Sequence, residues 1–289
     1  MNPYLTLIRP RQWFKNLFVL VGVFFSGQFT DPQTLLAALS LVLAFTLGSG
    51  AVYVFNDLVD AGVDRLHPRK QHRPIASGQI SRTAALVYAA ALCLVSAIIA
   101  AWISTSSLII IATYFVLNLA YTLSLKHIPV LDVFAIAGGF LLRVLIGTVG
   151  LGITPSNWLL LCTLMLTLFL GFAKRFSEKQ LATDSGSGRR VLERYSTRFL
   201  RGAMTLTAGG TIIAYVLYTV SPETIERQNT GNLIFTAIPV IYGIGRYFFL
   251  IVTQRTQDDA ATSFLQDRSL QLTAVAWIAL FWAVQSRAY

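Results

Sequence analysis

Charged residues are scarce in this sequence. Asp, Glu, Lys and Arg together make up 12% of the 289 residues, whereas a soluble globular chain carries about 25%. Hydrophobic residues make up 55%, and the mean hydropathy is +0.62. This composition excludes an ordinary soluble enzyme, a disordered protein and a collagen-like fibre. It predicts a polytopic membrane protein.

Cysteine and acidic residues are also few. The two cysteines, Cys93 and Cys162, lie in apolar runs without ligand spacing, which excludes a disulfide framework and a zinc site. Only 13 acidic residues face 23 Lys and Arg, for a net charge of +10. Such an excess would suggest nucleic acid as the partner of a soluble protein. In an apolar chain it predicts a basic cytoplasmic face and no nucleic-acid partner.

Long apolar runs recur along the whole chain. Each is long enough for a membrane-spanning helix, and none has the short alternating pattern of a barrel strand. No small-residue cleavage site closes the first run, so we expect no cleavable signal peptide. The sequence predicts an all-α polytopic membrane protein with nine transmembrane helices, at about 17–33, 36–56, 83–103, 107–124, 129–151, 156–173, 199–220, 232–252 and 270–286.

The distribution of Lys and Arg predicts the orientation. With the N-terminus inside, nearly all of these residues fall in cytoplasmic segments. The outer segments hold only Arg227 and Arg287, while Arg143 and Arg246 lie within spans. We therefore expect one integral membrane domain over residues 1–289 with its active site on the cytoplasmic side. The catalytic loops are expected at about 57–82, 125–132 and 174–198.

Three aspartates follow the second predicted span. At 100° per residue, Asp57, Asp60 and Asp64 lie on one helix face, with Asn56 beside them. Carboxylates gathered at the end of a span repel one another and require a cation. Oxygen ligands of this kind suit Mg²⁺ bridged to a substrate phosphate. The alternative is a solvated helix end paired with the Arg and Lys that follow.

A basic, proline-containing loop comes next. Its two prolines and a glycine indicate irregular backbone. Lys70 and Arg73 are candidate ligands for a phosphate, because arginine makes two-pronged contacts with phosphate oxygens. The positive-inside rule alone would also place cations here.

These two segments resemble those of the UbiA superfamily of intramembrane prenyltransferases. The likeness rests on Asn-Asp-x-x-Asp-x-x-x-Asp at 56–64 and Arg-Pro-x-x-x-Gly at 73–78. It implies nine helices and a Mg²⁺–diphosphate site. It also implies that Asn56, Asp57, Asp60 and Asp64 are the metal ligands, with the three aspartates catalytic.

A second acidic motif, which most members of that superfamily carry between spans six and seven, is missing. The corresponding loop is basic and holds Lys174, Arg175 and Arg194, with Glu178 the main acid near the membrane. The spacing of Glu178 from the two cations before it also suits a simple ion-pair ladder on a helix. The excess of cations favours an anion with more than one phosphate group.

Further cations lie near the spans. Arg143 sits deep in an apolar run and requires an anionic substrate head or a carboxylate from another helix. Asp132 lies roughly 16 Å away along a helix, so we do not expect it to be the direct partner. Lys15, Lys126 and Arg246 are further candidate ligands, although Lys15 and Arg246 could also extend to the membrane surface.

Five stretches resemble one branch of the superfamily, which transfers 5-phosphoribose from phosphoribosyl pyrophosphate to a polyprenyl phosphate. They are Arg-Pro-x-Gln-Trp-x-Lys-Asn at 9–16, His-Pro-x-Lys-x-x-Arg-Pro at 67–74, Leu-Lys at 125–126 with Asp132-Val, Gly-Phe-x-x-Arg at 139–143 and Phe-x-Lys-Arg-x-x-Glu at 172–178. The resemblance implies that Lys126, Arg143, Lys174, Arg175 and Arg194 bind the 5-phosphate and the acceptor phosphate, and that the product serves arabinofuranose donors for a bacterial cell envelope. Glu178 would orient Lys174 or Arg175, or bind ribose hydroxyls. The alternatives are prenyl transfer to an aromatic acceptor and, less favoured, a transporter. A homo-oligomer remains open.

Overall fold

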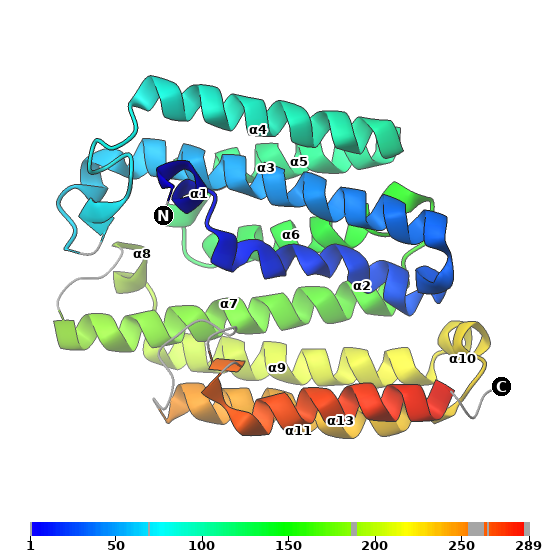
Figure 1. Cartoon of the computed structure of the whole chain (residues 1–289). Helices are drawn as coiled ribbons and strands as arrows, with labels where there is room; N and C mark the ends of the chain where they lie inside the picture. Colours follow the sequence, from blue (N-terminus) through cyan, green and yellow to red (C-terminus); the bar gives the residue numbers. More distant parts are fainter. Residues whose placement is uncertain (1, 69, 186–189, 254–262, 265, 286–289) are drawn as a thin grey trace. The chain divides into compact units, whose positions relative to one another are not determined.

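The computed structural model describes residues 2–68, 70–185, 190–253, 263–264 and 266–285. Every regular element within these ranges is a helix, either an α-helix or a 3₁₀ helix (Figure 1). Seven of the helices are long and apolar enough to cross a membrane. The predicted class, an all-α polytopic membrane protein, is therefore confirmed.

The chain divides into two compact units. Unit 1 comprises Met1–Leu125 and Gly139–Pro155, and unit 2 comprises Lys126–Gly138 and Ser156–Tyr289. Helix α6 (Leu131–Ile146) contributes its first half to unit 2 and its second half to unit 1. The single domain over residues 1–289 stays a prediction.

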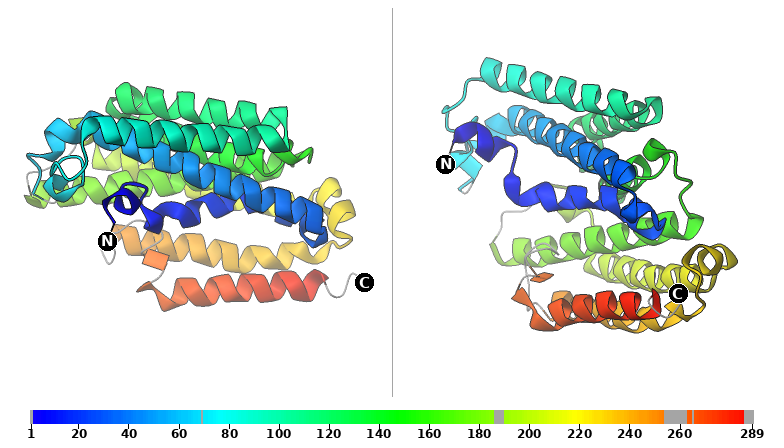
Figure 2. Two further views of the ribbon diagram at one scale, coloured as in Figure 1. Left: turned by 45° about the horizontal axis from the view of Figure 1, so that its top comes forward. Right: turned by 45° about the vertical axis from the view of Figure 1, so that its right-hand side comes forward.

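Unit 1 is built around the long helix α3 (Pro32–Asp64), which packs along α4 (Arg82–Ile103) and also against α5 (Thr105–Leu123) (Figures 1 and 2). Small residues allow this close packing, and Ser96 on α4 donates a hydrogen bond of 2.7 Å to the carbonyl oxygen of Ala44. The remaining elements of the unit are α1 (Pro3–Leu7), η1 (Pro10–Leu17), α2 (Phe18–Phe25), η2 (Gln28–Thr30), η3 (Lys70–His72) and η5 (Val149–Leu151).

Capping residues set where the long helices begin. The Asp31 carboxylate accepts a hydrogen bond of 2.9 Å from the Thr34 amide, and Pro32 occupies the first turn of α3. Ser81 caps α4 in the same way, and Ser104 caps α5. At its other end α3 continues through Asp64, so the first part of the predicted loop at 57–82 is helical. This continuation puts the three aspartates on a rigid helix.

The predicted count of nine spans is not reproduced. The seven qualifying helices correspond to the predicted spans from 36–56 to 232–252. The first predicted span, 17–33, is divided among α2, η2 and the start of α3, because α2 ends before Ser26 and Gly27 turns with a φ of 75°. α2 follows η1 (Pro10–Leu17) without a break, and neither of these two short helices is among the seven. The last predicted span contains the 18-residue α13 (Arg268–Gln285), which is not among the seven.

Unit 2 packs α7 (Asn157–Ser185) along α9 (Thr197–Val220), and α11 (Ala237–Val252) against α13 and α9 (Figure 1). Its core is rich in aromatic residues, among them Phe169, Phe176 and Tyr247. The shorter elements are α8 (Arg190–Glu193), α10 (Pro222–Gln228) and η6 (Asn232–Thr236), and η4 (Leu125–His127) lies at the boundary of the two units.

Two glycines bring α2 and the end of α6 into direct contact within unit 1. A Cβ atom at Gly147 would lie 1.8 Å from the carbonyl oxygen of Val19. A Cβ atom at Gly22 would lie 2.1 Å from Cγ2 of Thr148. Since no real Cβ approaches backbone so closely, only glycine fits at position 147 without moving the helices apart.

We expect Gly147→Ala to destabilise the protein by about 1–3 kcal/mol, because the added methyl group must displace the backbone at Val19. The measurement is the apparent melting temperature in detergent. Gly209→Ala is the matched control, since nothing lies within 4 Å of a Cβ atom at that position in α9. An equal melting temperature for Gly147→Ala and wild type would contradict the close packing.

Candidate functional site

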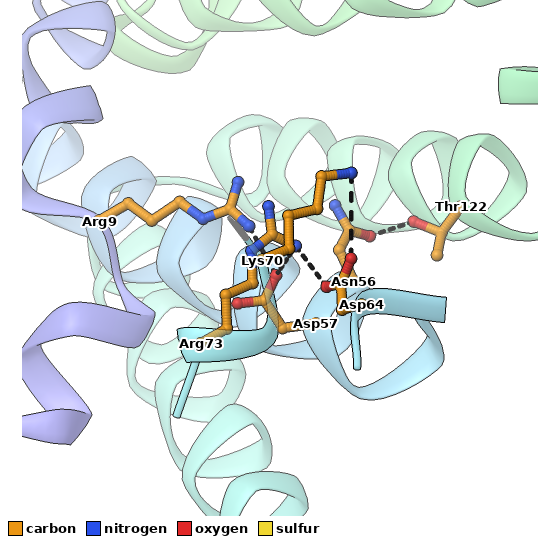
Figure 3. Close-up of polar contacts among 7 residues, drawn as sticks. All are labelled: Arg9, Asn56, Asp57, Asp64, Lys70, Arg73 and Thr122. Atoms are coloured by element: carbon orange, nitrogen blue, oxygen red, sulfur yellow. Dashed lines mark hydrogen bonds and ion pairs between the residues drawn. The ribbon is translucent and has the colours of Figure 1, made fainter. Parts of the chain in front are cut away.

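The acidic cluster of unit 1 is held by an arginine. Asp57 and Asp64 lie two turns apart on α3, and both carboxylates are buried. Nη1 of Arg73 donates to Oδ1 of Asp57 at 3.0 Å and to Oδ2 of Asp64 at 2.6 Å (Figure 3). Two carboxylates thus converge on a single cationic nitrogen atom.

A second arginine completes this cluster. Nη2 of Arg9, at the start of η1, donates to Oδ1 of Asp57 at 2.6 Å, and its guanidinium carbon lies 4.8 Å from the ring centre of Tyr53. Arg9 was not among the ligands predicted from the sequence. Two signals were present in the sequence: its place before Pro10, a position biased away from helical backbone, and its place at the start of the stretch 9–16, which resembles the branch that transfers phosphoribose.

Lys70 and Asn56 border the same cluster. Nζ of Lys70 lies 3.9 Å from Oδ1 of Asp64. The side-chain oxygen of Asn56 on α3 accepts a hydrogen bond from the hydroxyl of Thr122 on α5 (Figure 3). This bond links the two helices beside the cluster. Asp60 is half-buried on the same helix. The structure thus brings together Asn56, Asp57, Asp64, Lys70 and Arg73, five of the candidate site residues.

The donor set suits a hard divalent cation once Arg73 moves away. Oxygen atoms of Asp57 and Asp64 already lie within 3.0 Å of one common nitrogen position. Carboxylate oxygens are the ligands that Mg²⁺ prefers. As the side chains stand, no three His, Cys, Asp or Glu residues in the described part of the chain are grouped to hold a metal.

Arg143 is buried in unit 1 among neutral partners. It donates to the Asn16 side chain at 2.9 Å, to the carbonyl of Gly139 at 2.8 Å and to the Tyr114 hydroxyl at 3.3 Å. The rings of Phe45, Tyr114 and Phe140 lie within 5.2 Å of its guanidinium carbon. The ion pairs among the described residues do not include Arg143. Cation–π contacts and neutral acceptors therefore hold the charge. Of the two partners predicted from the sequence, an anionic substrate head or a carboxylate from another helix, the carboxylate is not among the contacts of Arg143 in the described part of the chain.

Unit 2 contains a buried network around Asp132. Nε of Arg175 donates to Oδ2 of Asp132 at 2.6 Å, and Nη1 of Arg175 donates to Glu178 at 2.6 Å. The hydroxyl of Tyr195 donates to Oδ1 of Asp132 at 2.6 Å. Arg175 is only 2% exposed. The pairing of Arg175 with Glu178 that the helical spacing suggested is present. The partners of Asp132 are Arg175 and Tyr195 and not Arg143, as expected.

The network also fixes the start of α6. The backbone N–H of Val130 donates to the Tyr195 hydroxyl oxygen at 2.5 Å, and Val130 has a left-handed φ of 72°. Burial, and then the hydrogen bond to the Asp132 carboxylate, raise the pKa of Tyr195 above its ordinary value. The phenol therefore stays neutral and keeps donating its proton at physiological pH.

The other predicted cations are more accessible. Lys174 and Arg194 are exposed in unit 2, while Lys126 is half-buried there and Lys15 is half-buried in unit 1. Arg246 donates to Asp267 at 2.7 Å. This hydrogen bond lowers the pKa of Asp267 below its ordinary value. Arg246 is thus paired with a carboxylate within unit 2.

We expect Arg175→Met to destabilise the protein by about 3–5 kcal/mol, because it leaves the Asp132 carboxylate buried without its cation. Lys174→Met is the matched control, since Lys174 is the residue before Arg175 and its side chain is exposed. Melting temperatures in detergent would show the difference. A loss of stability no larger for Arg175→Met than for Lys174→Met would mean that the buried ion pair contributes nothing specific.

Comparison with known proteins identifies close similarities over nearly the whole chain. Residues 16–284 match the UbiA prenyltransferase family. The decaprenyl-phosphate phosphoribosyltransferase of Mycolicibacterium smegmatis is 34% identical over 282 residues, covering 94% of this chain and 88% of that protein. The enzymes of the same name from Mycobacterium tuberculosis H37Rv and Corynebacterium glutamicum are 34% and 30% identical, over 94% of this chain and 90% and 83% of their own lengths.

Solved structures share the fold. A UbiA homolog from Archaeoglobus fulgidus bound to GPP and Mg²⁺ has a TM-score of 0.74, with 21% identity, and covers 99% of this chain and 100% of that one. The same homolog bound to DMAPP and Mg²⁺ has a TM-score of 0.75, with 21% identity and 99% coverage of both chains. At this identity the likeness concerns the fold alone.

Proposed function

Because this chain belongs to the UbiA prenyltransferase family, we propose that it transfers 5-phosphoribose from phosphoribosyl pyrophosphate to a polyprenyl phosphate such as decaprenyl phosphate. The observation that carries the proposal is the similarity, over 94% of the chain, to enzymes named decaprenyl-phosphate phosphoribosyltransferase. The product is a polyprenylphosphoryl-5-phosphoribose, a precursor of arabinofuranose donors for a bacterial cell envelope, and diphosphate is released.

The end of α3 is the proposed diphosphate site. Asp57, Asp60 and Asp64, with Asn56, hold the metal, and their oxygens are the ligand type that Mg²⁺ requires. When bound, Mg²⁺ neutralises the charge that develops on the leaving diphosphate. Support for a metal comes from the solved homolog with bound Mg²⁺ and from the convergence of two carboxylates on one point.

Basic side chains bind the phosphate oxygens. Arg73 and Lys70 already lie against the carboxylates and are placed to bind the diphosphate. The remaining anions are the 5-phosphate and the phosphate of the lipid. The cations proposed to bind these two groups are Lys15, Lys126, Arg143, Lys174 and Arg194. Since Arg175, Glu178 and Arg246 are held in ion pairs, we propose that they position neighbouring groups.

The chemical step breaks the bond between the anomeric carbon and the diphosphate oxygen. A bond from that carbon to an oxygen of the lipid phosphate replaces it, and the diphosphate leaves with the bonding electron pair. The attacking oxygen is already anionic, so no strong general base is needed. The protein contributes mainly by positioning the two substrates and by balancing their charge.

The protein is integral to the membrane. We propose that the N-terminus and the catalytic segments face the cytoplasm of the bacterial cell. The support is the concentration of Lys and Arg in the segments on the side of the N-terminus. Phosphoribosyl pyrophosphate, a charged donor that cannot cross the bilayer unaided, would then meet the site on the cytoplasmic side.

We expect Asp57→Asn to lower transfer by at least about a hundredfold, because the variant loses a metal ligand that stabilises the leaving group. The assay follows radiolabelled ribose from phosphoribosyl pyrophosphate into the lipid phase, with polyprenyl phosphate and Mg²⁺, and EDTA should abolish it. Asp31→Asn is the matched control, since this carboxylate caps the opposite end of α3 and asparagine caps equally well.

A parallel reaction with a prenyl diphosphate and 4-hydroxybenzoate tests the alternative. The solved homolog with bound GPP and Mg²⁺ is the observation in favour of this chemistry. Prenylated benzoate without any ribose label in the lipid would overturn the proposed function. Near-wild-type transfer by Asp57→Asn at saturating Mg²⁺ would instead overturn the assignment of the metal ligands.

A further inference from the structure

Cations already hold two buried carboxylates at the end of α3. Two buried carboxylates, those of Asp57 and Asp64, meet three cations, Arg9, Lys70 and Arg73. The carboxylates are 4% and 3% exposed, whereas each cation is between 28% and 38% exposed. The anions are therefore buried inside unit 1, while the cations that pair with them are partly exposed to solvent.

Arg9 is held against Asp57 by an unusual backbone. Its φ of 49° and ψ of 69° are left-handed, a conformation that residues other than glycine rarely adopt. Hydrogen bonds from the Arg9 amide to Thr6 and from the Gln12 amide to Arg9 fix this turn. The guanidinium then lies between the Tyr53 ring and the Asp57 carboxylate. Backbone strain of this kind is retained where a side chain must be aimed.

A metal ion and these guanidinium groups compete for the same oxygen atoms. Oδ1 of Asp57 already accepts from Arg9 at 2.6 Å and from Arg73 at 3.0 Å. Mg²⁺ would have to approach that oxygen to about 2.0–2.1 Å, and two positive charges would then repel it at close range. A metal ion alone therefore binds only if the arginines leave their carboxylates.

A diphosphate removes this conflict, because it offers oxygen atoms that arginine binds in a two-pronged manner. We propose that Arg9 is a further ligand of the diphosphate, and that Arg9 and Arg73 exchange the carboxylates of Asp57 and Asp64 for the diphosphate when it enters with its metal. The metal and the diphosphate then bind cooperatively, and the site excludes free metal. This inference rests on the proposed function, and it adds a residue and an order of events to it.

The test measures metal binding without turnover. Full-length protein in detergent is titrated with Mn²⁺ alone, and the electron paramagnetic resonance signal of free Mn²⁺ gives the bound fraction. We expect Arg9→Gln and Arg73→Gln to bind Mn²⁺ on the order of tenfold more tightly than wild type, because a competing positive charge is gone. Adding Asp57→Asn to either variant should remove the gain, which would locate the metal.

Two controls separate charge from folding. Arg9→Lys keeps the positive charge and should bind Mn²⁺ as weakly as wild type. Arg82→Gln removes an exposed arginine elsewhere in unit 1 and should leave the affinity for Mn²⁺ unchanged. In a thermal-shift assay, Mg²⁺ and inorganic pyrophosphate together should raise the melting temperature of wild type by more than the sum of the increases that each causes alone. Arg9→Gln should lose most of this excess.

The outcomes are distinct from those of the transfer assay. If Arg9→Gln, monodisperse and folded, binds Mn²⁺ no more tightly than wild type, the exchange is refuted. If it binds Mn²⁺ more tightly but keeps the full pyrophosphate effect, Arg9 is a counter-ion of Asp57 and not a ligand of the diphosphate, which also refutes the proposal as stated. Neither measurement requires ribose transfer, so the absence of transfer would count against the proposed function alone.

Discussion

A charge buried in apolar surroundings must be neutralised, and this constraint organises both units. In unit 1 the carboxylates of Asp57 and Asp64 share Arg73, and in unit 2 the carboxylate of Asp132 is held by Arg175 and Tyr195. Breaking either arrangement by removing one partner leaves an uncompensated ion, which costs far more than the net worth of the pair. Charged residues make up only 12% of the sequence, and these few are paired across distant segments of each unit.

The two arrangements differ in what they leave available. Arg175 is sealed in, with carboxylates on both sides and almost no exposed surface. Arg9, Lys70 and Arg73 lie on the accessible side of their carboxylates. A buried pair serves stability, whereas a half-exposed cation remains able to meet a second anion. The same chemical pairing thus supports the fold in unit 2 and, as proposed, recognition in unit 1.

Much of this architecture follows from the sequence. Hydropathy predicted seven spans correctly, and the helical spacing of Asp57 and Asp64 predicted that both lie on one face. The break at Gly27 was missed because the residues before it in α2 are uniformly apolar, so that hydropathy alone gives no sign of the turn. Arg9 was missed because its left-handed backbone and its contact with Asp57 depend on residues 48 positions away, which spacing cannot show. The partner of Arg175 likewise comes from a distant segment.

The network around Asp132 has an evolutionary consequence. Val130 is a β-branched residue in a left-handed conformation, and the Tyr195 hydroxyl that satisfies its N–H also bonds Asp132, which in turn holds Arg175. Glycine at position 130 would adopt the left-handed backbone without strain. Its N–H would still need the Tyr195 hydroxyl as acceptor, and that hydroxyl is held in place by Asp132. Substitutions at these four positions are therefore tolerated in combination rather than singly, and related sequences should show them varying as a set.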